Sequence, residues 1–216
     1  MMKNWDDIYS RKEQLNQYPF TEVVSFCMKN FKVGNTKVIY ALDVGMGSGV
    51  HSYFLTKFGF KVHGIDGSEY ATNNAKKKFP NRNITYECIQ FDKFNAKNKK
   101  FDFVLDRLST THSSKTITIK FYQDLRCALR SNAKIFWSGF CWDNSARQLG
   151  TKNSDGSYSN FKGGTLEKIA PAAFFKISDI KKIFNGYTLS SIRKISDKNM
   201  MSDYNNSFWV VEAIYD

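Results

Sequence analysis

The sequence predicts an α/β fold in which helices cover both faces of a mostly parallel sheet. From residue 37 onward, short apolar runs rich in β-branched residues alternate with segments whose apolar residues recur at helical spacing. The last two apolar runs, 188–195 and 207–216, are separated only by the polar stretch SDKNMMSDYNN, so we expect them to pair antiparallel. A length of 216 residues and a hydrophobic content of 42% suit one domain with one sizeable core.

Each element follows from its local pattern. Strands are expected at 37–44, 61–66, 84–90, 101–109, 133–140, 188–195 and 207–216. Helices are expected at 51–58, 69–79, 116–129 and 176–187, and over most of residues 1–36. Thr21 and Ser178 are the expected helix caps. Residues 142–174 are rich in Gly, Ser and Asn and are long for a structureless loop, which indicates a functional loop or a small insertion.

Composition restricts location and partners. The 32 Lys and Arg against 20 Asp and Glu give a formal charge of +12, but the lysines are scattered, which favours solvated side chains over a nucleic-acid surface. The four cysteines have no metal or redox spacing, so no metal is predicted. The N-terminal stretch MMKNWDDIYSRKEQ lacks an apolar signal core, and no apolar run is long enough to cross a membrane. We therefore expect a soluble, cytoplasmic protein without membrane contact; the oligomeric state stays open.

The stretch ALDVGMGSG contains the first candidate site. Asp43 precedes Gly45, Gly47 and Gly49, and Asp66 ends the next predicted strand. Ligands of such sheets bind at the carboxyl ends of the strands, where glycines expose backbone amides at a helix start. An acid at the end of the second strand is placed to accept hydrogen bonds from both hydroxyls of a ribose.

The same stretch separates two kinds of nucleoside cofactor. A dinucleotide turn needs a small residue at position 50, where this chain has Val50. Asp43, two residues before the first glycine, suits a cationic amine better than a pyrophosphate. An adenosine that carries an amino acid, S-adenosylmethionine, fits both features.

LDVGMGSG followed by VHGIDGS resembles motifs I and II of the class I S-adenosylmethionine-dependent methyltransferases (EC 2.1.1.-). The resemblance implies a Rossmann-like domain over 37–216, with a seven-stranded sheet in the order 3-2-1-4-5-7-6 and an antiparallel last strand. It also implies that Gly67, which follows Asp66, belongs to the cofactor site, and that Ser68 either closes the ribose pocket or has a turn or cap role.

Further site residues follow from the resemblance. The family places an acid near the adenine after the third strand, where this chain has Phe91 and Asp92. It places methionine-side and catalytic groups after the fourth strand, where Asp106, Arg107 and His112 stand. We expect His112 to be the general base and Asp106 to contact both the cofactor and the reacting groups. Arg107 is expected to pair either with Asp106 or with an anionic substrate.

Substrate contacts are expected from two segments. NWDDIYS is similar to the N-terminal segment of small-molecule methyltransferases that folds over the cofactor, so 1–36 is a predicted lid; Trp5 and Tyr9 share one helical face and either close the site or dock the helix. The insertion at 142–174 supplies Trp142 and Tyr158 beside basic and amide side chains, which suits a sugar or a phosphorylated small molecule.

Three functions stay open. The first is methylation of a hydroxyl or amine of a small molecule, with a sugar or nucleotide-linked sugar of surface polysaccharide synthesis as the specific candidate and an anionic acceptor as one option. The second is an RNA methyltransferase, which the charge favours. The third is a non-catalytic cofactor-binding protein. The sequence DRLSTTH departs from the Asn-Pro-Pro-Tyr type motif, which disfavours amide and nucleobase substrates.

Overall fold

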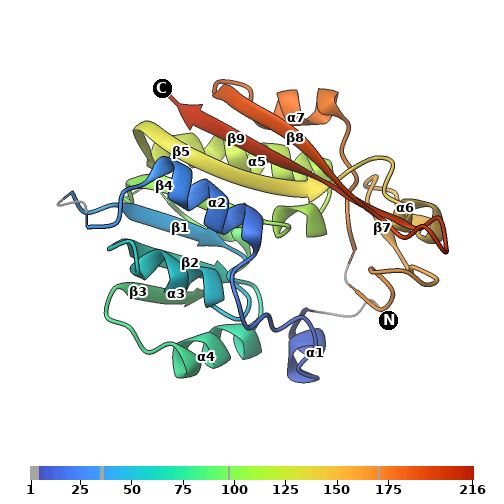
Figure 1. The fold of residues 1–216 in the computed structure, drawn as a ribbon, viewed down its shortest axis with the longest axis horizontal. Helices are drawn as coiled ribbons and strands as arrows, with labels where there is room; N and C mark the ends of the chain where they lie inside the picture. Colours follow the sequence, from blue (N-terminus) through green and yellow to red (C-terminus); the bar gives the residue numbers. More distant parts are fainter. Residues whose placement is uncertain (1–4, 35–36, 97, 170) are drawn as a thin grey trace.

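A seven-stranded sheet forms the centre of the molecule (Figure 1). The computed structural model describes residues 5–34, 37–96, 98–169 and 171–216. The strands are β1 (Tyr40–Val44), β2 (Lys61–Asp66), β3 (Ile84–Cys88), β4 (Phe101–Arg107), β5 (Leu129–Phe140), β8 (Thr188–Lys198) and β9 (Asn205–Tyr215). They lie in the order β3-β2-β1-β4-β5-β9-β8, and β9 runs antiparallel to both neighbours. The predicted strand order and the antiparallel last strand are confirmed.

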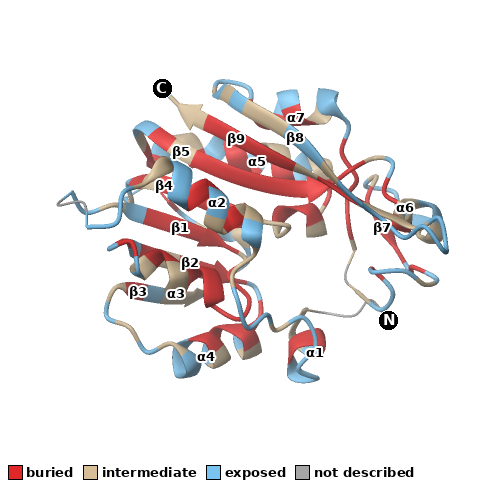
Figure 2. Ribbon diagram, in the orientation of Figure 1, coloured by how far each residue is buried: buried red, intermediate tan, exposed pale blue. Residues whose placement is uncertain are grey.

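Helices cover both faces of this sheet. They are α2 (Thr21–Asn30), α3 (Val50–Thr56), α4 (Glu69–Lys78), α5 (Lys115–Leu125) and α7 (Ile177–Ile183), and the shorter α1 (Trp5–Ser10) and α6 (Ala146–Leu149) lie outside the main layers. Phe103 of β4 packs in the cluster that contains α2 and α3, whereas its neighbour Val104 packs in the cluster that contains α5 and α7. Alternate residues are thus buried on opposite faces, which accounts for the continuous apolar runs of the parallel strands (Figure 2).

Two predicted helix caps are displaced by one or two residues along the sequence. The residue before α2 is Phe20, so Thr21 is already the first helical residue, and no side chain caps this end. The N-cap of α7 is Lys176, whose backbone amide donates to the Asp179 carboxylate 2.8 Å away, and Ser178 lies inside the helix. In both cases the helical pattern of apolar residues begins before the polar residue that was predicted as the cap.

The segment 142–174 has structure of its own. It contains α6 and the two short strands β6 (Thr151–Lys152) and β7 (Tyr158–Ser159), which pair with each other. The Tyr158 ring packs edge-on against Phe174 at 5.4 Å, and the Phe161 ring occupies the space that a side chain at Gly150 would need. The segment is therefore a packed extension of the core rather than an open loop.

Two carboxylates that the sequence assigned to the active site are buried within the sheet. Asp43 is 2% exposed and accepts a hydrogen bond from Ser52 Oγ at 2.6 Å, and burial raises its pKa to about 7. Asp106 is fully buried, and burial raises its pKa to about 6. Desolvation disfavours the charged form of both groups.

The raised pKa of Asp43 predicts a pH dependence of stability. Folded Asp43 keeps its proton up to about pH 7, whereas an unfolded aspartate loses it near pH 3.8, so its contribution to the free energy of unfolding falls as the pH rises through this window. One proton of difference changes this free energy by at most about 1.4 kcal/mol per pH unit. Asp43→Asn should remove this fall.

Urea unfolding of wild type and Asp43→Asn at pH 5 and pH 7.5 measures the effect. Asp106 and His51 also have different pKa values in the folded and unfolded states. Because both residues are present in the two proteins, their contributions to the pH dependence largely cancel when the two proteins are compared. Equal pH slopes for the two proteins would show that Asp43 is ionised in the folded state throughout.

Candidate active site

A cavity of about 770 Å³ lies at the carboxyl ends of β1, β2 and β4. It is lined by residues from α1, the loop before α2, the turn after β1, the ends of β2 and β3, the loop after β4, the segment 165–169 and the start of β9. This is the edge at which ligands bind in sheets of this type.

The glycine turn after β1 is closely packed on both sides. Gly45 has φ +64°, and a Cβ there would overlap the Ser109 hydroxyl. Gly47 has φ +51°, and a Cβ there would lie 3.1 Å from the Tyr9 hydroxyl oxygen. Both positions therefore require glycine for conformation and for space. Gly49 has φ +75° and lies outside the cavity lining, where Ala75 of α4 leaves no room for a side chain.

Asp66 lies at the centre of one half of the cavity. Its Oδ2 accepts a hydrogen bond from the Gly47 amide and its Oδ1 accepts one from the Ser68 amide, each at 2.9 Å. Each carboxylate oxygen has two lone-pair directions, so both can accept a further bond from a ligand. Burial raises the pKa of Asp66, and the two amides oppose that rise. Gly67, next to Asp66, also lines the cavity.

The border of this half comes from the end of β3. Ile89, Gln90, Phe91 and Asp92 line it. Phe91 is fixed by an edge-on contact with Phe121 at 5.3 Å. An apolar surface next to a carboxylate suits a purine ring with an exocyclic amine. The structure thus brings the predicted residues Asp66, Gly67, Phe91 and Asp92 to one place.

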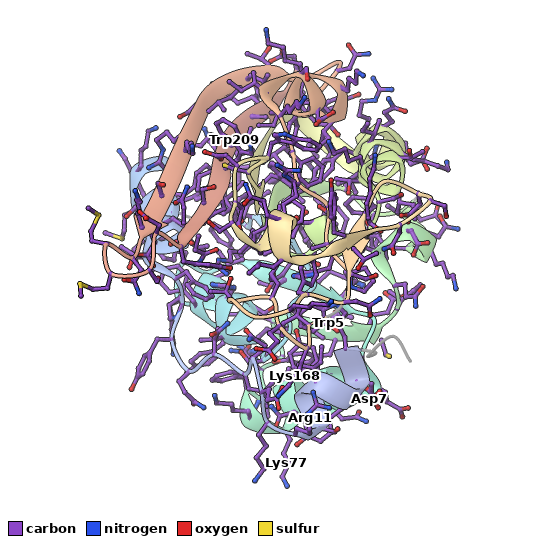
Figure 3. All side chains as sticks on the ribbon, turned by 90° about the vertical axis from the view of Figure 1, so that its right-hand side faces the viewer. Trp5, Asp7, Arg11, Lys77, Lys168 and Trp209 are labelled. Carbon is purple, nitrogen blue, oxygen red and sulfur yellow. The ribbon has the colours of Figure 1, made fainter. Side chains whose placement is uncertain are left out.

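Helix α1 packs over the cavity. Asp6 Oδ1 accepts hydrogen bonds from Ser68 Oγ at 2.6 Å and from the Tyr70 amide at 2.9 Å, which ties α1 to the start of α4. Trp5 and Tyr9 face the cavity, and burial raises the pKa of Tyr9. Figure 3 shows Trp5 between α1 and the body of the domain, with Asp7 on the outer side of the helix.

His112 ends the short 3₁₀ helix η2 (Thr110–His112) after β4 and lines the cavity. Its Nδ1 lies 3.1 Å from the Pro171 carbonyl oxygen. A carbonyl only accepts, so Nδ1 carries the hydrogen, and the lone pair of the neutral ring is on Nε2. The ring packs edge-on against Trp5 at 4.7 Å and Phe140 at 5.6 Å.

Arg107 also faces the cavity but does not pair with Asp106. Its Nε donates to Glu22 Oε1 at 3.2 Å. Its guanidinium carbon lies 3.4 Å from the centre of the Phe20 ring and 5.7 Å from that of Phe208. Burial lowers the pKa of the Arg107 guanidinium, while Glu22 opposes this change.

Six predicted site residues do not line the cavity: Asp43, Gly49, Ser68, Asp106, Trp142 and Tyr158. Ser68 is the N-cap of α4, accepting from the Ala71 amide at 3.0 Å. Trp142 lies among the cationic groups of Lys115, Arg147 and Lys176, at 4.3–4.9 Å from its ring. Tyr158 packs in the core, and the two aspartates are buried in the sheet.

Asp106 has a structural role instead of the predicted catalytic one. Its Oδ1 accepts from the Ser109 amide at 2.9 Å and the Thr110 amide at 3.2 Å, and its Oδ2 accepts from Thr110 Oγ1 at 2.5 Å and Tyr122 OH at 3.0 Å. Four donors saturate the carboxylate, so it holds the loop that carries His112.

Several lining residues had no motif in the sequence. His51 is buried, accepts from the Phe20 amide at 3.2 Å, and has its pKa lowered to about 3 by burial and by the Arg107 charge. The segment 142–174 contributes Thr165, Leu166 and Ile169 instead of Trp142 and Tyr158, and β9 contributes Asn206 and Phe208. Their approach depends on the course of the chain, which residue types alone do not indicate.

The described residues contain no group of three or more His, Cys, Asp or Glu side chains arranged to hold a metal ion. Among the same residues, no helix is long and apolar enough to cross a membrane.

Comparisons with known proteins agree with the fold. Residues 41–132 match the family model described as a methyltransferase domain. No curated protein matches the sequence significantly. One similar solved structure concerns the conversion of a disulfide bond into a thioacetal group during echinomycin biosynthesis. It has 17% identity and a TM-score of 0.69, over 98% of this chain and 90% of that one.

Two other solved structures are similar. An S-adenosylmethionine-dependent methyltransferase of Methanosarcina mazei has 14% identity and a TM-score of 0.69, over 92% of this chain and 98% of that one. The N-methyltransferase NodS of Bradyrhizobium japonicum, in complex with S-adenosylhomocysteine, has 13% identity and a TM-score of 0.66, over 94% and 90%. Together with the family match and the strand order, these likenesses confirm the predicted resemblance: residues 41–132 match a methyltransferase domain, and the whole chain has the fold of these S-adenosylmethionine-dependent methyltransferases.

Proposed function

We propose that the protein methylates a hydroxyl or amine of a small molecule bound in the cavity beside S-adenosylmethionine. The observation that carries this proposal is that one cavity of about 770 Å³ joins a nucleoside-type half around Asp66 to a second half around His112. Pockets for small ligands usually measure about 300–1,000 Å³, and this cavity lies in the upper part of that range.

The cofactor half fits the proposed cofactor in shape and chemistry. Asp66 would accept hydrogen bonds from the ribose hydroxyls, and Asp92 would accept from the adenine amine beside Phe91. The Gly45–Gly47 turn leaves room for the amino-acid part because neither glycine carries a side chain. S-adenosylmethionine supplies a methyl group on a sulfonium, which is displaced in line by a nucleophile.

His112 is the proposed general base for a hydroxyl acceptor. The Pro171 carbonyl fixes the tautomer in which Nε2 carries the lone pair, and Trp5 and Phe140 fix the ring. A base held this way takes the hydroxyl proton as the oxygen attacks the methyl group. An amine that arrives neutral needs no base, so the importance of His112 depends on the acceptor.

The acceptor half is mainly apolar with polar groups at its border. Trp5, Phe20, Phe140 and Phe208 supply aromatic surface, and Asn206 supplies an amide. Aromatic faces with hydrogen-bonding groups also suit a sugar, so we keep a sugar or nucleotide-linked sugar of surface polysaccharide synthesis as the specific candidate. We further propose that α1, within the predicted lid 1–36, acts as the lid, whereas α2 of the same segment packs in the core. We propose that 142–174 contributes to acceptor binding through Thr165, Leu166 and Ile169.

The charge distribution disfavours the RNA alternative. Arg107 is the one Lys or Arg among the described lining residues, and it is already paired with Glu22. RNA binding needs phosphate contacts from several cations. The excess of lysines therefore lies away from the cavity that would hold the methyl acceptor.

Asp66→Ala tests the cofactor assignment. Each charge-assisted hydrogen bond to the ribose contributes about 1.5–3 kcal/mol. Calorimetry should therefore show S-adenosylhomocysteine affinity lowered more than about tenfold. Asp43→Asn is the matched control, because Asp43 lies outside the cavity and should leave this affinity unchanged. The reverse pattern would mean that Asp43, and not Asp66, contacts the cofactor.

His112→Asn tests the general base. The asparagine amide can still donate to the Pro171 carbonyl but cannot take a proton, so a purely structural role would survive this change. With a hydroxyl acceptor, single-turnover rates should fall by about 10²–10⁴-fold with little change in cofactor affinity. His63→Asn, in β2 and outside the lining, is the control. Full turnover by His112→Asn would place the base elsewhere.

A labelled-methyl transfer assay tests the proposed function as a whole. The acceptors are small aromatic alcohols and amines, free sugars, nucleotide sugars and total RNA, each with wild type and with Asp66→Ala. We expect transfer to a small molecule and none to RNA. Transfer to RNA alone, lost steeply as the salt concentration rises, would favour the RNA alternative.

A further inference from the structure

We infer that the methyl acceptor carries one carboxylate, and that Arg107 binds it. This inference rests on the proposed function, because it assigns a recognition role to the acceptor half of the same cavity. It makes Arg107 a specificity-determining residue at one end of the acceptor and His112 the residue at the reactive end.

Arg107 is held in place with most of its donors unused. Among the described residues, Nε is its one nitrogen within hydrogen-bonding distance of an acceptor, Glu22 Oε1. No fully buried side-chain nitrogen or oxygen of the described residues lacks a partner. The two Nη groups therefore are not sealed in the core, and Arg107 borders the cavity.

The surroundings prevent Arg107 from turning away. Phe20 stacks on the guanidinium from one side at 3.4 Å, and Phe208 lies at 5.7 Å. Cation–π contacts of this kind are stronger where water is excluded. His51, beside Arg107, has its pKa lowered to about 3 and is therefore neutral at physiological pH. The cavity thus presents one fixed cation, which Glu22 engages through Nε alone.

An aromatic surface connects this cation with His112. Phe140 and Phe208 are directly opposite each other in the antiparallel pair β5–β9, which places their side chains on the same face of the sheet. His112 packs against the Phe140 ring at 5.6 Å, and Arg107 lies beside the Phe208 ring. A ligand on these two rings meets Arg107 at one end and His112 at the other.

The chemistry of Arg107 favours a carboxylate. A planar guanidinium whose two Nη groups have no acceptor among the described residues can bind both oxygens of a carboxylate. Glu22 already offsets the formal charge of Arg107, so a bound carboxylate leaves the three groups with one net negative charge, whereas a phosphate dianion leaves two and is the less favourable ligand to desolvate. Removing a charged ligand from water without such a partner would be unfavourable.

Matched pairs of probes test the inference by calorimetry. Wild-type protein saturated with S-adenosylhomocysteine is titrated with 3- and 4-hydroxybenzoate, with the corresponding neutral hydroxybenzamides, and with phenyl phosphate. We expect at least one acid to bind about tenfold or more tightly than its amide and than phenyl phosphate. Arg107→Gln should remove this preference and leave the affinities for the amides and for S-adenosylhomocysteine unchanged.

Two further variants distinguish a ligand contact from a folding effect. Glu22→Gln keeps Arg107 and removes the competing charge, so it should increase the preference for the acid over the amide. Arg147→Gln removes a cation that also stacks on an aromatic ring, Trp142, but lies outside the cavity, so it should change nothing.

The outcomes separate this inference from the proposed function. The inference would be overturned, with S-adenosylhomocysteine still bound, by any of four results. Acids and amides could bind equally, phenyl phosphate could bind more tightly than the acids, or no acid could bind at all. The fourth result is that Arg107→Gln and Glu22→Gln leave the preference for the acid unchanged. Loss of S-adenosylhomocysteine binding by wild-type protein would instead overturn the cofactor assignment on which the proposed function depends.

Discussion

The buried carboxylate of Asp106 is the constraint on which the cavity depends. Its four donors come from the loop after β4 and from Tyr122 of α5, and Trp137 of β5 joins them because its Nε1 donates to Thr110 Oγ1 at 3.0 Å. One charged group thus connects two strands, a helix and the loop that carries His112. A saturated buried acid makes such a loop rigid, since each broken bond would leave a desolvated polar group unsatisfied.

The same loop sets the geometry of the cofactor half. Ser109, whose amide donates to Asp106, occupies the space beside Gly45 where a side chain would stand. The next glycine, Gly47, is packed against Tyr9 and donates its amide to Asp66. The chain from Asp106 through Ser109 and the glycine turn to Asp66 therefore couples the position of His112 to that of Asp66, the acid proposed to bind the ribose.

The sequence predicted the fold better than the site, for a physical reason. Strand order and element positions depend on periodicity and glycine turns, which are local. Asp106 and Asp43 do not line the cavity, and the sequence could not indicate this, because a carboxylate near a strand end has the same sequence pattern whether it faces a ligand or the core. Ser68 and Trp142 also lie outside the lining, because capping and cation stacking depend on neighbours. Glu22, which pairs with Arg107, lies 85 residues away along the chain, and no local pattern joins them.

The electrostatics of the cavity differ from those of the whole chain. The formal charge is +12, yet the charged residues of the described lining are Asp66, Asp92 and Arg107. The two acids line the half that is proposed to bind the cofactor, and the arginine lies in the other half, where Glu22 offsets it. With S-adenosylmethionine bound as proposed, this division would keep cationic side chains away from its sulfonium. A composition count cannot predict such a separation, because it depends on which side chains face the cavity.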